Sequence, residues 1–330
     1  MTMASKRCAR RWPLGRQLAL ACATLVAGAT GASAGAEARG GLGHLYLKTY
    51  YATSSGDTGY DRAGNEVSLT STAFLDRVTS TFASDGDYRD TSFGIYAQVG
   101  LLPDLDLIVA TEWKEIEKSF ELGAFGISLP VEQSSSGFAD VNAGLAYQVL
   151  ADPLPVGLRA VMRIPTYSTG VKALHLETIN SADDEIALGN GTLDLLLGAA
   201  VSSGPLVSWM FVDLSASYAL ADLEHREFSD RIEWEAKVGT SRWGFGVAGF
   251  VAGVDSLRNG SAPSTITQDL LFLDPATRVT VLNDQESVNI GGQLWYAWEG
   301  LGIQLGYATM IAGANTTKTD RFEVAVFAQR

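Results

Sequence analysis

The sequence predicts an all-β fold, a transmembrane antiparallel β-barrel of about twelve strands, and three observations lead to it. Apolar and polar residues alternate in stretches of about ten residues. The connections between these stretches are alternately short and long, and a secretory leader precedes them. Alternation gives a strand one apolar and one polar face. In an outer-membrane barrel the apolar face contacts lipid and the polar face lines the lumen.

Residues 1–34 have the three parts of a secretory signal peptide. Met1–Arg16 carries five basic residues and no acidic one, Leu18–Ala29 is largely apolar, and Ala32–Ala34 reads Ala-Ser-Ala, a small-residue cleavage site. The apolar run is shorter than the roughly 20 residues that a membrane-spanning helix needs. We therefore expect cleavage after this site, a barrel over residues 35–330 and a location in the outer membrane.

The chain is acidic, with a formal net charge of −13 at pH 7. Nucleic-acid binding needs a basic surface, so this charge argues against it. Two interpretations of the acidity are open: solvated acidic loops with a charged lumen, or a preference for cations with divalent bridging to lipopolysaccharide. Both cysteines, Cys8 and Cys22, lie in the predicted leader, and the three histidines are scattered. We therefore expect no disulfide, no metal site and no cofactor.

Twelve stretches of the chain have the strand pattern. The cleanest is Asp140–Val149, where Val, Ala, Leu, Tyr and Val occupy the odd positions and polar or small residues the even ones. The others carry apolar residues at every second position, as strands with one lipid-facing side require. In chain order the predicted strands are Gly41–Ala52, Asp90–Gly100, Asp104–Glu117, Phe138–Leu150, Pro155–Thr166, Gly191–Ser202, Leu206–Ala221, Asp230–Gly239, Trp243–Val254, Ser287–Trp298, Leu301–Ile311 and Thr319–Gln329.

The connections give an independent argument for a barrel. Bacterial barrels have short periplasmic turns and longer extracellular loops, and with twelve strands both termini lie on the short-turn side. A β-sandwich has no reason to sort its loops in this way. The short turns are 101–103, 151–154, 203–205, 240–242 and 299–300, and the long segments are 53–89, 118–137, 167–190 and 258–286. Val67–Phe82 has two alternative interpretations, either another hairpin, which would give fourteen strands, or a short helix in a loop.

Aromatic residues gather near the ends of the predicted strands. Such residues form girdles at both membrane interfaces of a barrel, although aromatic residues also favour strands in general. The girdle candidates are Tyr46, Tyr50, Trp113, Tyr147, Tyr218, Trp243, Tyr296 and Trp298.

The polar faces of the strands place charged and amide side chains toward the lumen. The lumen candidates are Asp140, Asn142, Arg159, Arg163, Asp194, Asp213, Arg231, Glu233, Glu235 and Lys237. Several of them lie on consecutive predicted strands, and Arg231–Lys237 places four charges in one row. Two interpretations are open: paired charges that fix or close the lumen, or a gate or substrate path with a charged lining.

Three stretches in the middle third of the chain carry a family resemblance. Tyr96–Leu107 reads YAQVGLLPDLDL, Gly137–Tyr147 reads GFADVNAGLAY and Leu158–Thr166 reads LRAVMRIPT. In this order they resemble a turn and two strands of the outer-membrane proteins named for the meta-pathway of phenol degradation, which are relatives of hydrocarbon and fatty-acid porins. The chain differs in having Arg163 where the family pattern has lysine. The resemblance implies a small monomeric barrel that passes apolar or aromatic compounds.

Three functions fit this sequence. The first, which we expect, is a channel for passive uptake of small hydrophobic or aromatic molecules, with outer-membrane lipid, lipopolysaccharide, the barrel-assembly machinery and a small apolar ligand as partners. The second is a plugged barrel with a structural or adhesive role. The third is a barrel enzyme, such as a lipid hydrolase, that uses His44 or His225. A hydrolase needs its histidine beside a nucleophile and an orienting residue, and the sequence around these histidines offers little of this.

Overall fold

The described part of the chain consists of strands and their connections. The computed structural model describes residues 42–60, 63–68, 82–124, 127–151, 154–166, 192–203, 210–224, 228–260, 284–314 and 316–330, so the predicted leader and the predicted loop 167–190 lie outside it. Its strands are β1 (Leu45–Tyr60), β2 (Glu66–Ser68), β3 (Phe82–Leu102), β4 (Leu105–Ala124), β5 (Ile127–Phe138), β6 (Val141–Leu150), β7 (Val156–Ile164), β8 (Asp194–Ser202), β9 (Met210–Leu220), β10 (Arg231–Arg242), β11 (Phe245–Ser256), β12 (Glu286–Trp298), β13 (Leu301–Ala314) and β14 (Thr316–Gln329). A helix that is long and apolar enough to cross a membrane is absent from these described residues.

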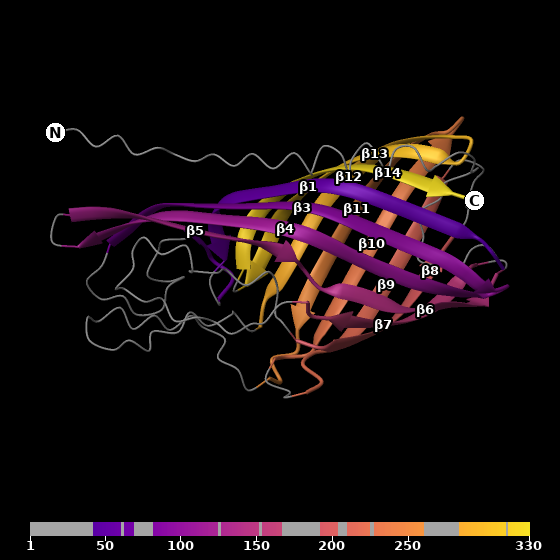
Figure 1. The fold of residues 1–330 in the computed structure, drawn as a ribbon, viewed down its shortest axis with the longest axis horizontal. Coiled ribbons are helices and arrows are strands. Elements are labelled where there is room, and N and C mark those ends of the chain that lie inside the picture. The colour runs from indigo at the N-terminus through magenta and orange to yellow at the C-terminus, as the bar shows by residue number, and fades with distance from the viewer. Residues whose placement is uncertain are drawn as a thin grey trace, which may run out of the picture.

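One antiparallel sheet closes on itself to form a barrel (Figure 1). Its twelve strands follow the chain order β1, β3, β4 and β6 to β14, and β14 pairs with β1. At the join, Leu45 and Arg330 exchange two backbone hydrogen bonds with N···O distances of 3.0 and 2.8 Å. Both chain ends of the barrel thus lie at the rim with the short turns, called the short-turn rim below, and the opposite end is the long-loop rim. The predicted twelve-stranded transmembrane barrel is confirmed.

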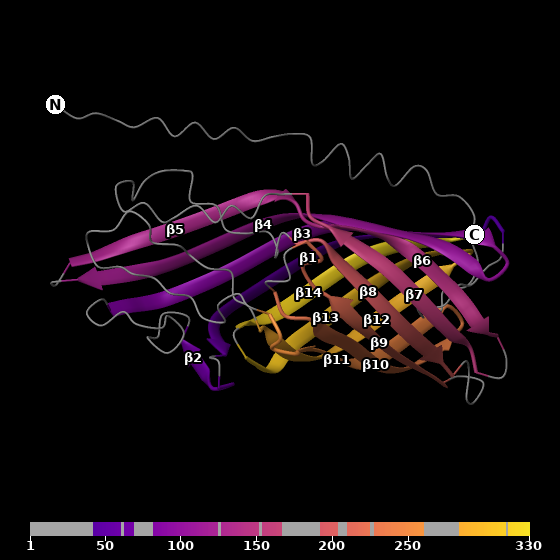
Figure 2. The ribbon, with the colours of Figure 1, turned by 90° about the horizontal axis from the view of Figure 1, so that it is seen from below.

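Two further strands lie outside the ring. In the described part of the chain, β2 pairs with β1 alone and β5 with β4 alone. β4 is shared, because Leu105–Ala110 pairs with β6 whereas Trp113–Ala124 pairs with β5. As a result, β3, β4 and β5 continue as a sheet beyond the long-loop rim (Figure 1, Figure 2).

The prediction that segments 53–89 and 118–137 are loops is wrong in large part. β1 continues to Tyr60, β3 already begins at Phe82, and the β4–β5 hairpin occupies most of the second segment. Beyond the membrane neither face of a sheet contacts lipid, so these strand ends need no apolar alternation and escape a prediction based on it. The alternative of fourteen strands is not realised in the ring, because β1 pairs directly with β3. Residues 69–81 of Val67–Phe82, the segment on which this alternative rested, lie outside the described part of the chain.

A bulge divides the predicted strand Phe138–Leu150. Trp113 lies opposite Phe138, but Ala110 lies opposite Asn142, so one extra residue separates β5 from β6. The extra residue changes which positions face outward: Phe138, at an even position, and Leu145, at an odd one, are both exposed on the outer face. The even positions of β6 therefore face the lumen.

The outer face of the barrel is apolar, as the alternation predicts. On β13, Ile303, Leu305 and Tyr307 are 49, 43 and 51% exposed, whereas Gln304 between them is only 8% exposed. Large exposed apolar side chains are costly in water but match the hydrocarbon of a bilayer. The polar side chains of the same strands therefore point into the barrel.

Aromatic side chains form bands at both ends of the outer face. Near the long-loop rim, Tyr51, Phe93, Trp113 and Phe138 are successive neighbours across strands. Near the short-turn rim, the rings of Phe245 and Tyr296 lie with centroids 4.8 Å apart, and other exposed aromatic residues lie close to the same turns. These bands correspond to the interfacial girdles of membrane barrels.

Two of the predicted girdle residues, Tyr46 and Tyr50, face the lumen instead. The Tyr50 hydroxyl donates to Glu112 Oε2 at 2.9 Å. The Tyr46 ring stacks on Phe327 with centroids 6.2 Å apart. Their even positions on β1 place them inside, while Tyr51 is 48% exposed outside. Closeness to a strand end does not identify a girdle residue unless its face is also known.

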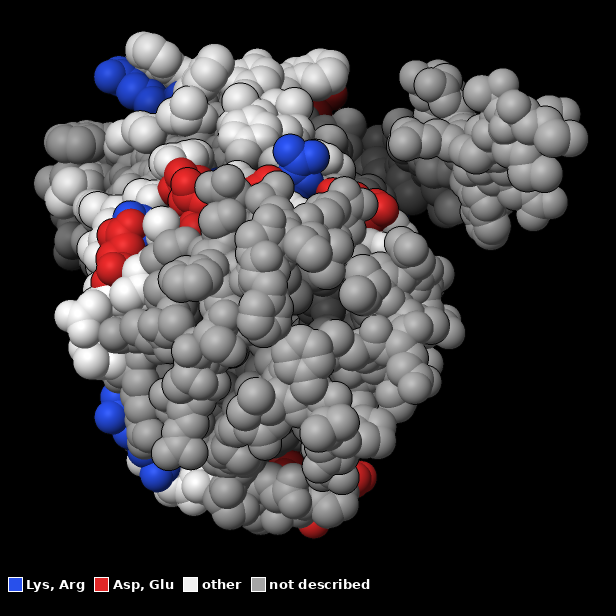
Figure 3. All heavy atoms as spheres, turned by 90° about the vertical axis from the view of Figure 1, so that its left-hand side faces the viewer, with Lys and Arg blue, Asp and Glu red and all other residues white. Residues whose placement is uncertain are grey.

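The long-loop rim carries both signs of charge (Figure 3). Arg258 Nη2 lies 2.9 Å from Glu286 Oε1, and Lys318 Nζ lies 2.8 Å from Glu66 Oε1. Both pairs are well exposed, so each contributes little to stability. Pairing of this kind offsets part of the negative charge of the chain.

Because the outer face contacts lipid, we expect Leu305→Arg to destabilise the barrel. Leu305 lies midway along the apolar face of β13, so we expect a loss of about 2–4 kcal/mol in unfolding free energy, because arginine at the bilayer midplane is poorly solvated. Urea unfolding of the protein in lipid vesicles measures this loss. Leu301→Arg, beside the Glu299–Gly300 turn, is the matched control, with an expected cost of about 0–1 kcal/mol. Equal losses of unfolding free energy in the two variants would contradict the placement of Leu305 at the bilayer midplane and of Leu301 near the interface.

Candidate functional site

Nine of the ten residues predicted for the lumen lie on strands β6 to β10. Asn142, Arg163 and Asp194 are neighbours in register on β6, β7 and β8. Arg159 lies opposite Gly198, which is followed by Ser217 on β9 and then by β10. The large apolar residues at the alternating positions are exposed on the outer face, which leaves the polar positions inside. Asp140 is half-buried and immediately precedes β6.

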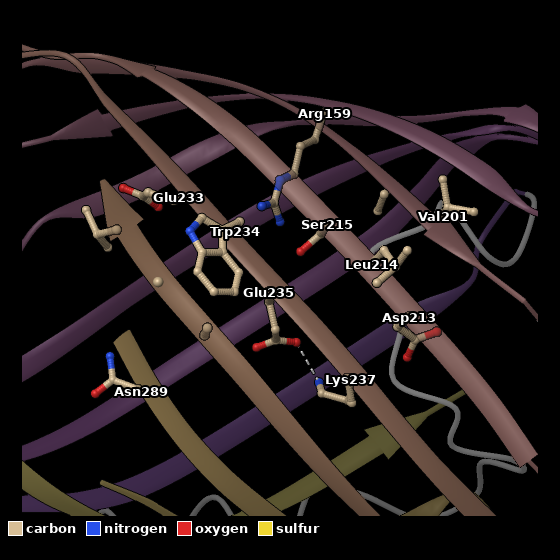
Figure 4. Close-up of a pocket in the computed structure, with 14 residues that line it drawn as sticks. Arg159, Val201, Asp213, Leu214, Ser215, Glu233, Trp234, Glu235, Lys237 and Asn289 are labelled. Carbon is tan, nitrogen blue, oxygen red and sulfur yellow. Dashed lines mark ion pairs between the residues drawn. The ribbon is translucent and has the colours of Figure 1, made fainter. Parts of the chain in front are cut away.

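A cavity of about 420 Å³ lies against this wall, between β7 and β12 (Figure 4). Its polar lining consists of Arg159, Asp213, Ser215, Glu233, Glu235, Lys237 and Asn289. Five of these are predicted lumen residues, contributed by β7, β9 and β10. Small residues such as Ala200 and Ala252 leave the space that the charged side chains surround. The volume is in the range of small-molecule sites, about 300–1,000 Å³.

Beside the cavity, two arginines and two carboxylates form a closed ion network. Arg231 Nη2 lies 2.6 Å from Asp194 Oδ2, and Arg231 Nε lies 3.0 Å from Glu233 Oε1. Arg163 contacts the same two carboxylates, at 3.6 Å from Asp194 Oδ2 and 3.2 Å from Glu233 Oε1. Asp194 is 1% exposed and also accepts the backbone N–H of Asp222 at 3.0 Å. Each buried charge is thereby compensated, as burial requires.

The network covers an apolar row of the inner wall. Val161, Leu196 and Ala219 are buried neighbours across β7, β8 and β9. Arg231 continues this row on β10, opposite Ala219. The arginine side chains therefore have apolar residues beneath them, which lowers the local polarity and strengthens the ion pairs.

The other charged residues of the cavity lie outside this network and form ion pairs or hydrogen bonds with residues near them. Lys237 Nζ lies 3.0 Å from Glu235 Oε1 on the same strand, the pair marked in Figure 4. The Ser202 hydroxyl donates to Asp213 Oδ1 at 2.5 Å. Arg159 differs, because Nε and Nη2 donate to the hydroxyl of Ser217 at 3.1 and 2.7 Å rather than to a carboxylate.

A second polar cluster on β1, β4 and β14 was missed at the sequence level. Lys48 Nζ lies 2.7 Å from Glu323 Oε1, and Lys114 Nζ lies 2.8 Å from Glu112 Oε1. Glu112 also accepts the Tyr50 hydroxyl. These positions alternate with outward apolar residues just as the predicted ones do. The rule that every second residue of a strand faces the lumen, called the parity rule below, would therefore have found them.

Aromatic rings on the inner wall lie against glycines of the neighbouring strand. A Cβ on Gly246 would overlap the Trp295 ring, and a Cβ on Gly291 would overlap the Phe250 ring. The rings of Phe211 and Trp295 lie with centroids 6.1 Å apart. All three rings are partly exposed on the inner face, so the lumen offers apolar surface as well as charge.

His44, the one of the two histidines considered for catalysis that the structure describes, does not line the cavity. His44 lies before β1 at the short-turn rim, where its carbonyl accepts the backbone N–H of Gly100 at 2.8 Å. His225 lies outside the described residues. Among the described residues, no group of three or more His, Cys, Asp or Glu side chains has the arrangement of a metal site.

The ion network predicts a large effect of Asp194→Asn. This change leaves two arginines sharing one carboxylate in a buried setting, so we expect a loss of about 3 kcal/mol in unfolding free energy. Urea unfolding in lipid vesicles measures it. Glu286→Gln removes a carboxylate from the exposed pair with Arg258 and should cost about 0–1 kcal/mol. A loss for Asp194→Asn no larger than for this control would refute a stabilising role of the network.

The chain is similar in fold to outer-membrane proteins of known structure. An outer membrane channel from Pseudomonas putida F1 matches with a TM-score of 0.58 and 16% identity, over 91% of this chain and 100% of that chain. The transport unit of the autotransporter AIDA-I from Escherichia coli has a TM-score of 0.42 and 8% identity, over 96 and 97% of the two chains. OprD from Pseudomonas aeruginosa has a TM-score of 0.33 and 9% identity, over 89 and 95%. No protein-family model and no curated protein sequence matches the chain. The likeness to the channel from Pseudomonas putida shows the fold, that of an outer-membrane β-barrel.

Proposed function

We propose that the protein is a channel of the outer membrane for passive passage of small molecules with apolar or aromatic parts. The observation that carries this proposal is the inner wall of the closed barrel, where a cavity of about 420 Å³ with charged and apolar residues in its lining adjoins partly exposed aromatic rings. Polar groups keep a lumen hydrated, and rings hold aromatic or apolar solutes by stacking and burial. A solute with both kinds of surface finds partners for both on this wall.

Phe250 connects the two kinds of surface. It lies opposite Lys237, which lines the cavity, and its ring rests on Gly291 of β12. Phe211 and Trp295 extend the apolar surface toward the short-turn rim. A solute that leaves the cavity toward this rim therefore meets these rings in succession.

We propose transport rather than catalysis for the same wall. The described residues that line the cavity include no histidine, cysteine or other activated nucleophile with its base. Its carboxylates are held by arginine, lysine or hydroxyl partners. The described residues of the lining can therefore bind a solute, and none of them is placed to attack it.

A plugged barrel with an adhesive role is the second candidate. The sheet of β3, β4 and β5 beyond the long-loop rim favours it, because such a sheet presents backbone and side chains outside the membrane (Figure 2). Conductance separates the two functions. A channel gives stable steps of ion current in planar bilayers, whereas a plugged barrel that folds normally gives none.

Phe250→Ala tests the aromatic path. Benzyl alcohol added to a conducting channel should reduce the ion current. The concentration that halves the current should rise about fivefold in the variant, since one ring contact contributes about 1 kcal/mol. Phe245→Ala is the matched control on the same strand, because Phe245 is 68% exposed on the outer face. Unchanged block in Phe250→Ala, or the same rise in both variants, would contradict an aromatic path through the lumen.

A further inference from the structure

The neighbouring strand leaves space for the side chain of Arg159 on the inner wall. It lies opposite Gly198 on β8, and a Cβ at that glycine would come within 2.8 Å of Arg159 Nε. The missing side chain lets the guanidinium pass over β8 and reach Ser217 on β9. Glycine, arginine and serine from three successive strands thus fix one cation at the cavity. Figure 4 shows this cation, the guanidinium of Arg159, among the residues that line the cavity.

The guanidinium of Arg159 differs from the two nearby ones in its partners. Arg163 and Arg231 each contact two carboxylates. Arg159 contacts the Ser217 hydroxyl, and in the described part of the chain no carboxylate lies within ion-pairing distance of it. A guanidinium has five N–H donors in a planar fork, so several remain for a ligand in the cavity.

We propose that Arg159, held by Ser217, is a binding subsite for the carboxylate of a small solute that passes through the lumen. This inference rests on the proposed channel function and names the chemistry of its substrate. The planar fork of arginine matches a carboxylate in two parallel hydrogen bonds. Rings such as Phe250 provide apolar surface farther along the same wall. The substrate class is therefore a small aromatic or apolar monocarboxylate.

The charges around the cavity favour a single negative charge over a double one. Glu233 is compensated by Arg163 and Arg231, and Glu235 is compensated by Lys237. Asp213 also lines the cavity, so a phosphate dianion would meet an acidic neighbour with a single cation to offset it. The carboxylate thus has an advantage over a phosphate of similar size.

The experiment compares benzoate with benzamide, which has the same shape and no charge, as blockers of the ion current in planar bilayers. In the unmodified protein, benzoate should halve the current at a concentration about tenfold lower than benzamide. Arg159→Gln should abolish this difference and leave the benzamide value unchanged. Arg159→Lys should restore part of it, because it keeps the charge and loses the fork. Phenyl phosphate should block no better than benzamide.

Arg258→Gln is the control for long-range electrostatics, because it removes one cation from the exposed rim without touching the cavity. It should keep the preference for benzoate. Heat-modifiable migration in gels verifies that each variant is folded. A preference that survives in Arg159→Gln, disappears in Arg258→Gln or is absent from the unmodified protein would overturn the inference, while block by benzamide would leave the channel function standing. A folded protein without conductance would overturn both.

Discussion

Closure of β14 on β1 is the constraint on which the rest of the structure depends. In hydrocarbon no water is available to an unpaired backbone N–H or C=O, so an open sheet edge is excluded from the membrane. The register from Tyr46–Gln329 to Tyr60–Thr316 pairs the first and last spanning strands along nearly their whole length. With the ring closed, each strand has one face toward lipid and one toward the lumen. Residues far apart in the chain, such as Lys48 and Glu323, become neighbours on the inner wall only through this closure.

The inner wall then has to accommodate charge in a narrow space. It does so mainly by pairing, as in the network around Asp194 and in the cluster of Glu112 with Tyr50 and Lys114. Where rings occupy the wall, glycines on the neighbouring strand make the space for them. Pairing stabilises the barrel but leaves few groups for a ligand. Arg159 is different, because its partner is the neutral hydroxyl of Ser217. Its guanidinium therefore keeps N–H donors that can bind a ligand.

Alternation predicts the fold well because lipid enforces it. Wherever one face of a strand contacts hydrocarbon, the sequence shows the pattern, and the twelve spanning strands are found near their predicted places. The β4–β5 hairpin and the outer part of β3 lie beyond that constraint, so their pattern is weak and they were predicted as loops. For the site, parity indicates which residues face inward, including Arg159 and Asp194. It does not indicate their pairings, because Arg163, Asp194 and Arg231 meet across strands whose register the sequence does not specify. Tyr50 was misplaced since its nearness to a strand end was given more weight than its parity.

The central claim is that one face of each strand lines a water-filled lumen and the other contacts lipid. Cysteine substitutions, one at a time, at positions 213 to 216 of β9 test it most directly, after Cys8 and Cys22 are replaced by serine. A membrane-impermeant thiol reagent should label Asp213→Cys and Ser215→Cys in vesicles, but not Leu214→Cys or Ala216→Cys. Labelling that alternates along the strand in this way is the predicted result. Uniform labelling, or no labelling at the inward positions, would contradict a hydrated lumen and the functions built on it.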